Sequence, residues 1–308
     1  GTACGITMRV IALVLAVDQV AGWVRAQAPP GCVNGIGNKT RWTSAWGQCS
    51  EKDAMVAWLK EPANAGTIRS VVLYGAGPQM VNGTVMINNT RRDAAVECVR
   101  SFRELGVGVD AILSIAHWGA WKNASADAPA AAALLEWAVA VNLTGYSSDY
   151  EGNDCDHAKH GPMGRLFGTM KRLLEPHCIQ VAPFVDFSPC YIGSYTNWRN
   201  NVSRILDGYC YRSGSYRNFD GQCHAAHPFM ASDGHVAAAF MSGSTGNKKK
   251  GSWGYSAAGA QTRVNLITKA GSVEVALFTL LKTAPWWPPI LRQFLAGNPP
   301  PSNATVAA

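Results

Sequence analysis

Strand-like apolar runs alternate with helix-like amphipathic runs along this chain, from about residue 40 to near its end. The expected strands cover residues 41–49, 68–74, 107–116, 143–151, 179–187, 207–211, 235–241 and 273–280. The helical patterns cover residues 51–60, 90–105, 128–141, 163–174, 195–206, 257–269 and 289–295. Mostly continuous apolar strands joined by helices are typical of a parallel sheet covered by helices. Eight such strands predict an α/β fold, a single-domain (β/α)8 TIM barrel.

Composition supports one large folded domain. The chain has 308 residues, of which 47% are hydrophobic and 15% are charged, which suits a full core and argues against disorder. A doubly wound open sheet is the alternative, but no Gly-x-Gly-x-x-Gly follows an expected strand. We expect the barrel domain over residues 29–298 and a flexible tail over residues 299–308.

The first 28 residues have the pattern of a leader with a secretory signal peptide. A basic Met8-Arg9 start precedes the apolar run 10–17, and Ala26-Gln27-Ala28 forms a small-x-small cleavage site. Asp18 ends the apolar run, which is too short to cross a bilayer, so we expect no stable membrane insertion. A buried N-terminal helix is the alternative interpretation.

Cysteines and glycosylation sequons also favour a secreted or endomembrane-lumenal glycoprotein. Asn-x-Ser/Thr sequons begin at Asn38, Asn82, Asn88, Asn123, Asn142, Asn201 and Asn303. Removal of the leader leaves Cys32, Cys49, Cys98, Cys155, Cys178, Cys190, Cys210 and Cys223. This even set is compatible with disulfide bonds, although the sequence does not give their pairing. No Cys-x-x-Cys pair is present, which argues against a zinc ribbon.

The chain is basic, with a formal net charge of +7. Its one dense basic run, Lys248-Lys249-Lys250, lies among Gly and Ser residues and is typical of a solvated loop. Nucleic-acid binding would need a broader basic stripe with interleaved aromatic residues. We therefore expect no nucleic-acid partner, and we expect a monomer.

The end of the fourth expected strand carries two carboxylates, Asp149 and Glu151. Side chains two positions apart on a strand share a face, so their backbones lie about 6–7 Å apart. Repulsion and burial raise the pKa of one such carboxyl group and make it a usable acid near neutral pH. The pair suits glycoside cleavage, which needs a proton donor and a stabilising negative charge. A solvated or salt-bridged strand end is the alternative.

Other polar and aromatic residues also stand at expected strand ends, where the active site of such a barrel lies. Aromatic faces in these loops suit the stacking of sugar rings. These candidate substrate-binding residues are Tyr74, His117, Trp118, Asp186, Tyr209 and Tyr211.

On these residues the chain resembles the chitinase-like and endo-N-acetylglucosaminidase-like glycoside hydrolases of family 18. The fourth strand of that family ends in Asp-x-x-Asp-x-Asp-x-Glu; residues 144–151 keep Asp149 and Glu151, with Thr144 and Ser147 at the earlier Asp positions. The family motifs at strands three and six keep only Ser114 and Tyr211. The tryptophan that ends strand eight in the family is not at the matching place, and Trp286 and Trp287, a few residues beyond, could substitute for it.

The resemblance implies roles for these residues in a secreted enzyme that cleaves N-acetylhexosamine-containing glycans by a retaining, substrate-assisted mechanism. Glu151 would be the general acid, and the N-acetyl carbonyl of the substrate would attack the anomeric carbon. Asp149 would orient that acetamide, with Tyr211 as a hydrogen-bond partner. The partner is an oligosaccharide or polysaccharide substrate, and no cofactor or metal is implied.

A non-catalytic, chitinase-like carbohydrate-binding lectin is one alternative. The departures at Thr144, Ser147 and Ala116 favour it, because they fall within the family motifs. The presence of both Asp149 and Glu151 opposes it.

Two other barrel enzymes are weaker alternatives. A family 25-like muramidase also has an Asp-x-Glu, but it needs a further acidic residue near the first strand, and residues 41–49 have none. A metal-dependent phosphodiesterase would use the cluster Glu151, Asp154, Asp156, His157 and His160. The spacing of that cluster does not match the His-Glu-x-x-His helix pattern.

Overall fold

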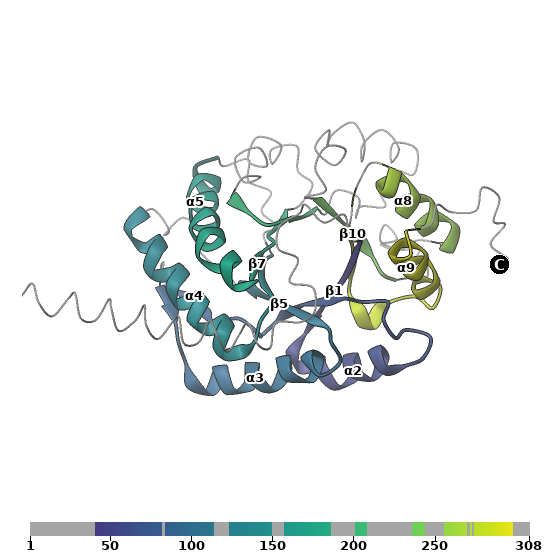
Figure 1. Ribbon diagram of the computed structural model, residues 1–308, viewed down its shortest axis with the longest axis horizontal. Helices are drawn as coiled ribbons and strands as arrows, with labels where there is room; N and C mark the ends of the chain where they lie inside the picture. The colour runs from purple at the N-terminus through teal and green to yellow at the C-terminus, as the bar shows by residue number, and fades with distance from the viewer. Residues whose placement is uncertain are drawn as a thin grey trace, which may run out of the picture.

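The computed structural model describes residues 41–81, 84–113, 123–149, 157–185, 201–207, 236–243, 256–269, 272 and 274–297. Within them, one parallel sheet has the strand order β7-β6-β5-β2-β1-β11-β10-β9-β8 and curls round on itself (Figure 1). Its strands are β1 (Trp42–Gln48), β2 (Ser70–Tyr74), β5 (Gly108–Leu113), β6 (Gly145–Ser148), β7 (Gln180–Val181), β8 (Phe184–Val185), β9 (Ile205–Asp207), β10 (Val236–Met241) and β11 (Glu274–Phe278). The expected leader and tail lie outside the described residues.

The two ends of this strand order belong to one stretch of chain, which closes the barrel. Only Ala182 and Pro183 separate β7 from β8; β7 pairs with β6, and β8 pairs with β9. The backbone N–H of Ser203, just before β9, also donates to the carbonyl oxygen of Val181 in β7 at 2.8 Å. The short strands β7 and β8 thus form one interrupted strand, and nine strands fill eight positions. The predicted TIM barrel is confirmed.

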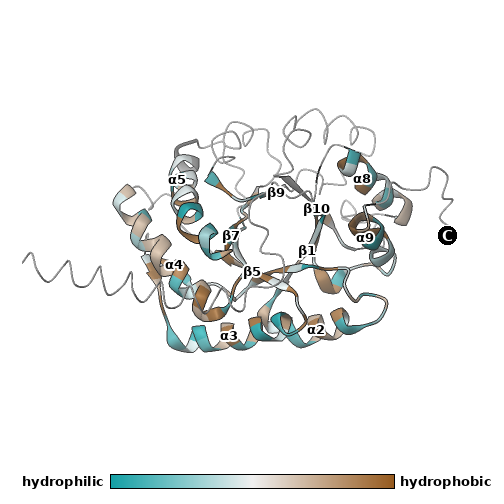
Figure 2. Ribbon diagram, viewed as in Figure 1, coloured by the Kyte–Doolittle hydropathy of each residue, from teal (hydrophilic) through white to brown (hydrophobic). Residues whose placement is uncertain are grey.

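Helices surround the barrel on the outside (Figure 1). They are α2 (Lys52–Lys60), α3 (Asn89–Arg103), α4 (Asp127–Val141), α5 (His157–Leu174), α8 (Ala257–Lys269) and α9 (Trp287–Leu295). Figure 2 shows mostly hydrophobic colour along β5 and mixed colours on α2 and α3, as expected for helices with one buried face. Short 3₁₀ turns occur at Cys49–Glu51, Ala124–Ala126, Glu175–His177 and Leu280–Lys282.

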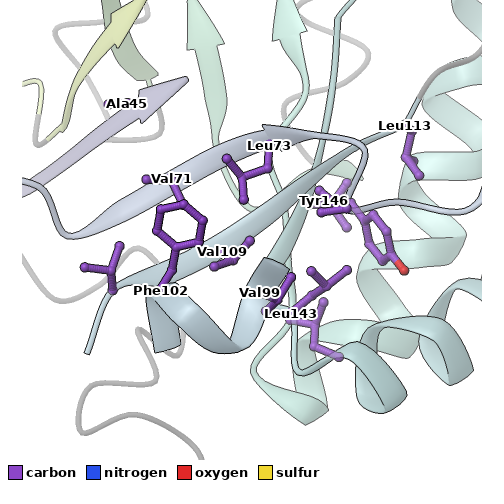
Figure 3. Packing of buried hydrophobic residues seen from close by; sticks show 14 of the residues in the cluster. Ala45, Val71, Leu73, Val99, Phe102, Val109, Leu113, Leu143 and Tyr146 are labelled. Carbon is purple, nitrogen blue, oxygen red and sulfur yellow. The ribbon is translucent and has the colours of Figure 1, made fainter. Parts of the chain in front are cut away.

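The main hydrophobic core lies between the strands and the helices. Alternate residues of β2 and β5, including Val71, Leu73 and Val109, point outward and pack against Val99 and Phe102 of α3 (Figure 3). All five are fully buried. The twofold alternation of strand side chains explains why one face of each strand serves this core and the other serves the barrel interior.

The alanine-rich α4 belongs to this helix layer. Residues Ala124–Val141 are long and apolar enough, by composition, to cross a membrane. However, α4 buries Leu134 and Trp137 in the core, and the hydroxyl of Tyr146 in β6 donates to the carbonyl oxygen of Leu134 at 2.7 Å. These contacts account for the hydrophobicity of α4 as that of a barrel helix.

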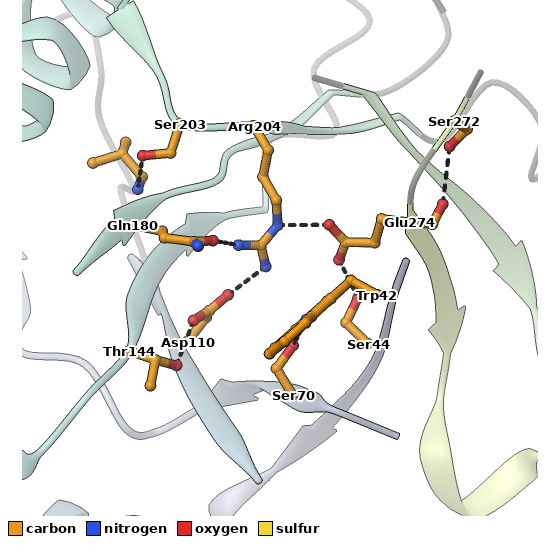
Figure 4. Close-up of polar contacts among 11 residues, drawn as sticks. Trp42, Ser44, Ser70, Asp110, Thr144, Gln180, Ser203, Arg204, Ser272 and Glu274 are labelled. Atoms are coloured by element: carbon orange, nitrogen blue, oxygen red, sulfur yellow. Dashed lines mark hydrogen bonds and ion pairs between the residues drawn. The ribbon is translucent and has the colours of Figure 1, made fainter. Parts of the chain in front are cut away.

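The barrel interior has a polar layer at the amino-terminal ends of the strands. Arg204, beside β9, forms ion pairs with Asp110 of β5 and Glu274 of β11, each at 2.7 Å (Figure 4). Its guanidinium also donates to Gln180 of β7. Ser44 donates to Glu274 at 2.7 Å, which completes the ring of partners. The usual barrel interior is dominated by branched apolar side chains, so this layer is a distinctive feature of the chain.

Above the polar layer lies an apolar one. It contains Trp46, Val72, Ile112, Phe184 and Ala276, and Tyr74 and Phe278 pack against it. These residues alternate with the outward-facing core residues on the same strands. They therefore form the floor beneath the carboxyl-terminal mouth of the barrel.

One expectation from the sequence needs correction, and one element was missed. The helix expected over residues 195–206 is wrong at its end, because Ile205–Asp207 is strand β9 and pairs with β8 and β10. Apolar residues at 202, 205 and 206 fit a helical period, but pairing with two neighbouring strands prevails. A hairpin that the sequence did not indicate, β3 (Gln79–Val81) and β4 (Thr84–Met86), follows β2.

One disulfide bond, Cys49–Cys98, links the end of β1 to α3. Cys178 is disulfide-bonded as well. Both observations agree with the expected use of cysteine in an oxidising compartment.

Candidate active site

Asp149 directly follows β6 and lies on the inner side of the barrel. On β6 the side chain of Tyr146 points outward to α4, and Ser147 pairs in register with Ile112, a residue of the interior layer. Asp149 stands two positions after Ser147 and so shares its face. The carboxylate is half-buried at the carboxyl-terminal end of the strand. This is the end at which barrel enzymes carry their active sites.

Tyr74 brings a second functional group to Asp149. Its hydroxyl donates a hydrogen bond to Asp149 Oδ2. Tyr74 ends β2, and β5 lies between β2 and β6 in the sheet, so this hydrogen bond joins strands that are not neighbours. The structure thus brings together two of the residues that the sequence placed at strand ends.

Burial controls the protonation of Asp149. It raises the pKa of the Asp149 carboxyl above its usual value of 3.8, and the hydrogen bond from Tyr74 opposes this by lowering the pKa. Of these two effects burial is the larger, so the pKa of the carboxyl is raised overall. Burial acts in this direction because it disfavours the charged form of the group. Within the described residues, Asp149 Oδ1 is buried and accepts no hydrogen bond. The carboxylate therefore has one oxygen held by the protein and one left for another donor.

The floor beneath Asp149 is aromatic. Trp46 of β1 lies at its centre, with the rings of Phe184 and Phe278 edge-on at centroid distances of 4.9 and 5.4 Å and Tyr74 at 6.4 Å. The indole N–H of Trp46 is buried and has no hydrogen-bond partner in the described part of the chain. Sequence reasoning missed Trp46 and Phe278, although the alternation of Ser44 and Trp46 on one face of β1 could have indicated an inward tryptophan.

Trp286 and Trp287 lie in the helix–strand layer. Trp287 begins α9, is fully buried, and packs against Phe240 of β10 with the ring centroids 5.9 Å apart. Trp287 has no exposed surface and packs in the core between strands and helices, so its burial gives no support to the substrate-binding role expected for it. Trp286 is partly buried against the same core, and the ring centroids of Trp286 and Trp287 are 5.2 Å apart. Phe278, at the end of β11, is instead the aromatic residue that reaches the interior from the eighth strand position.

The remaining candidates cannot be placed. Glu151, His117, Trp118, Asp186, Tyr209 and Tyr211 lie outside the described residues, as do Asp154 and Asp156 of the possible metal cluster. His157 and His160 begin α5. Among the residues that the structure describes, no group of three or more His, Cys, Asp or Glu side chains could hold a metal ion.

Comparison of whole structures relates the chain to chitinases. No protein-family model and no curated protein sequence matches it. A chitinase from Bacteroides thetaiotaomicron is similar at TM-score 0.65 and 11% identity, over 84% of this chain and 97% of that one. A family 18 chitinase from Pseudoalteromonas aurantia is similar at TM-score 0.58 and 12% identity, over 82% and 99%. A class V chitinase from Nicotiana tobaccum, solved in complex with NAG4, is similar at TM-score 0.63 and 8% identity, over 83% and 98%.

Nearly the whole length of each of these chitinases aligns with this chain, but the sequence identity is only 8–12%. Similarity at such low identity shows a shared fold. The chain thus has the barrel fold that these chitinases have.

Proposed function

We propose that this protein is a glycoside hydrolase of the chitinase type that cleaves N-acetylhexosamine-containing glycans by a retaining, substrate-assisted mechanism. The observation that carries the proposal is the position of Asp149. It stands inside the barrel at the carboxyl end of the fourth strand position, is half-buried, and is hydrogen-bonded to Tyr74 across the mouth. The barrel shared with chitinases supports the same conclusion.

In this mechanism Glu151 donates its carboxyl proton to the glycosidic oxygen as the bond from that oxygen to the anomeric carbon breaks. The acetamide carbonyl oxygen of the same sugar forms a new bond to the anomeric carbon from the opposite face. Water, which gives a proton to Glu151, then attacks the anomeric carbon and breaks the bond between that carbon and the acetamide oxygen. Two inversions give net retention of configuration, and no second protein nucleophile is needed, unlike in the usual two-carboxylate pattern.

Asp149 is suited to assist this attack. Its buried Oδ1 has no partner among the described residues and can accept the acetamide N–H, while its negative charge stabilises the positive charge that develops on the cyclised acetamide. Partial burial strengthens that electrostatic effect, since water screens it less. The aromatic floor of Trp46 and Phe278 excludes water below the carboxylate.

Export from the cytosol is part of the proposal. The Cys49–Cys98 disulfide and the bonded state of Cys178 support an extracellular or lumenal protein, because such bonds are rare where thiols are kept reduced. In this proposal residues 1–28 are a leader that directs export, and residues 29–298 are the barrel domain.

Cleavage of a chito-oligosaccharide, followed by separation of the products, tests the function. Wild-type protein should release shorter oligosaccharides, and Glu151→Gln should lower that rate by about 10²–10⁴-fold, because the amide has no proton to transfer. Glu136→Gln, at an exposed position of α4, is the matched control and should cleave at the wild-type rate. Unchanged cleavage by Glu151→Gln would refute the assignment of the acid.

A carbohydrate-binding barrel without turnover is the second candidate. Ser147 favours it, because this residue stands where the family resemblance places a carboxylate and its hydroxyl has no partner within the described residues. Calorimetry that detects chito-oligosaccharide binding, with no product after prolonged incubation, would select this candidate over the enzyme.

A further inference from the structure

We propose that Tyr74 is a positioning residue for Asp149 and supplies it with a hydrogen bond that Ser147, its neighbour on the same face of β6, does not make. This proposal rests on the proposed function. The hydroxyl of Ser147 is buried and forms no hydrogen bond to Asp149 or to any other described residue. The donor to Asp149 comes from a different strand, β2.

Tyr74 is held firmly enough to fix a partner. Its ring packs against the interior aromatic layer, and the ring of Trp46 lies edge-on to it with centroids 6.4 Å apart. Trp46 is in turn enclosed by Phe184 and Phe278. Gly75 follows with φ of +87°, a conformation that favours glycine and turns the chain sharply after the tyrosine. A residue fixed in this way can hold a carboxylate at one orientation.

The hydrogen bond distinguishes the two oxygens of Asp149. Oδ2 accepts the hydrogen bond from the Tyr74 hydroxyl, whereas Oδ1 is buried and has no hydrogen-bond partner in the described part of the chain. Rotation of the carboxylate would break the hydrogen bond to Tyr74. Tyr74 therefore holds the carboxylate in one orientation and leaves Oδ1 as the oxygen that can accept a hydrogen bond from an acetamide N–H.

A phenol and a carboxyl group differ as donors. Phenols are much weaker acids than carboxylic acids, so a tyrosine hydroxyl can donate to a carboxylate throughout the neutral range. A carboxyl partner donates only while it is protonated. The hydrogen bond from Tyr74 favours the charged form of Asp149 against the opposing effect of burial, and no charged residue in the described ranges contributes to this balance. Glu151, two positions along, is the further titratable group expected on the same face.

The competing role for Tyr74 is direct contact with substrate, as its strand-end position first indicated. A positioning role works only through Asp149, whereas substrate contact does not. Tyr74→Phe, Asp149→Asn and the double variant separate the two roles, because the hydroxyl loses its effect in the Asp149→Asn background only if it acts through Asp149. Tyr146→Phe is the matched control: it removes a hydroxyl from the adjacent part of the barrel that faces α4 and not the mouth.

The activity experiment measures kcat and KM for a chito-oligosaccharide against pH. Tyr74→Phe should lower kcat by about 10–100-fold, the effect of one hydrogen bond to a charged group, with little change in KM. It should also move the acidic limb of the pH profile to higher pH, because the pKa of Asp149 rises when the donor is lost. Tyr146→Phe should change neither. An equal effect of Tyr74→Phe in the Asp149→Asn background would overturn the proposal and assign Tyr74 to substrate contact.

A second measurement uses the free protein and needs no turnover. In wild type, the ring ¹³Cζ resonance of Tyr74 should titrate with Asp149, whereas that of Tyr146 should not, and Asp149→Asn should abolish the titration. A flat Tyr74 resonance over the acidic range would overturn the proposal even if the enzyme is active. Absence of cleavage with an intact titration would instead count against the proposed function and leave the coupling of Tyr74 to Asp149 established.

Discussion

The guanidinium of Arg204, beside β9, lies 2.7 Å from the carboxylate of Asp110, on β5, across the interior of the barrel. Two strand positions, that of β6 and that shared by β7 and β8, separate these strands. Because both side chains are nearly inaccessible to water, the contact replaces hydration that each charge has lost. It therefore ties the later strands to the earlier ones below the candidate active site.

Arg204 forms ion pairs with both carboxylates of this layer. Glu274 forms its second ion pair at 2.7 Å. The planar guanidinium can donate to Asp110, Glu274 and Gln180 at once, a geometry that an ammonium group cannot reproduce. One arginine side chain therefore contacts Asp110, Glu274 and Gln180 together.

Replacement of Arg204 by methionine should destabilise the protein strongly. The variant leaves two buried carboxylates without their cation, and breaking a buried pair in this way costs about 3–5 kcal/mol. Urea unfolding followed by circular dichroism measures the change. Arg172→Met, at an exposed position of α5, is the control and should stay within about 0.5 kcal/mol of wild type. A loss below about 1 kcal/mol for Arg204→Met would show that the layer tolerates unpaired charge.

Stability should depend on pH through Glu274. Burial raises the pKa of the Glu274 carboxyl above its usual value of 4.5, with nearby Asp110 adding to the rise, while Arg204 and Ser44 oppose it. Because the folded protein binds this proton more tightly than the unfolded chain does, its stabilising contribution is present below pH 4.5 and is lost as pH rises through the folded-state pKa.

Glu274→Gln removes this dependence. The free energy of unfolding of this variant, relative to that of wild type, should increase as pH rises from 4 to 8. Denaturant titration at each pH measures the difference. The variant Glu136→Gln on the surface of α4 should parallel wild type throughout. A difference between Glu274→Gln and wild type that falls with pH would contradict the direction of the pKa shift.

Gly145 should tolerate no side chain. A Cβ atom there would lie 2.6 Å from Asp110 Oδ1, which is closer than real contacts allow, and 3.0 Å from the carbonyl oxygen of Gln180, which is a tight contact. Gly145→Ala should therefore destabilise the protein by about 1–3 kcal/mol, the usual cost of overpacking. Gly161→Ala is the control, because nothing lies within 4 Å of its Cβ position on α5, and alanine there should be neutral or stabilising. Equal melting temperatures for the two variants would contradict the packing described around Asp110.

The sequence predicted the barrel well because alternation is a local property. Runs such as Ser70–Tyr74 and Gly108–Leu113 are mostly apolar, and the next helical pattern follows each of them along the chain. The end of the 195–206 helix was wrong because the same apolar residues fit two periods, and only pairing of Ile205 with Val236 decides between them. The hairpin after β2 was missed because each of its strands has three residues.

The candidate site was only partly accessible from sequence. Asp149 and Tyr74 could each be placed at a strand end, but their contact depends on the curvature of the sheet, which brings the ends of β2 and β6 together across β5. Trp287 was expected near the site from its position after the last strand, and its burial against Phe240 could not be read from that position. Such pairings depend on residues far apart in the chain, which no local pattern reports.

Asp149→Asn should reduce turnover while leaving the fold as stable as wild type or more so. The amide cannot offset the positive charge that develops during cleavage, and loss of one such electrostatic contact costs about 10²–10³-fold in kcat. Since burial raises the pKa of Asp149, its charge is unfavourable in the folded protein above about pH 4, and a neutral amide removes that cost. Chito-oligosaccharide cleavage and denaturant unfolding at pH 7 measure the two effects, with Asp93→Asn at an exposed position of α3 as the control. A stable variant with unchanged turnover would remove Asp149 from the mechanism, whereas lower turnover that follows from unfolding would show that its role is structural.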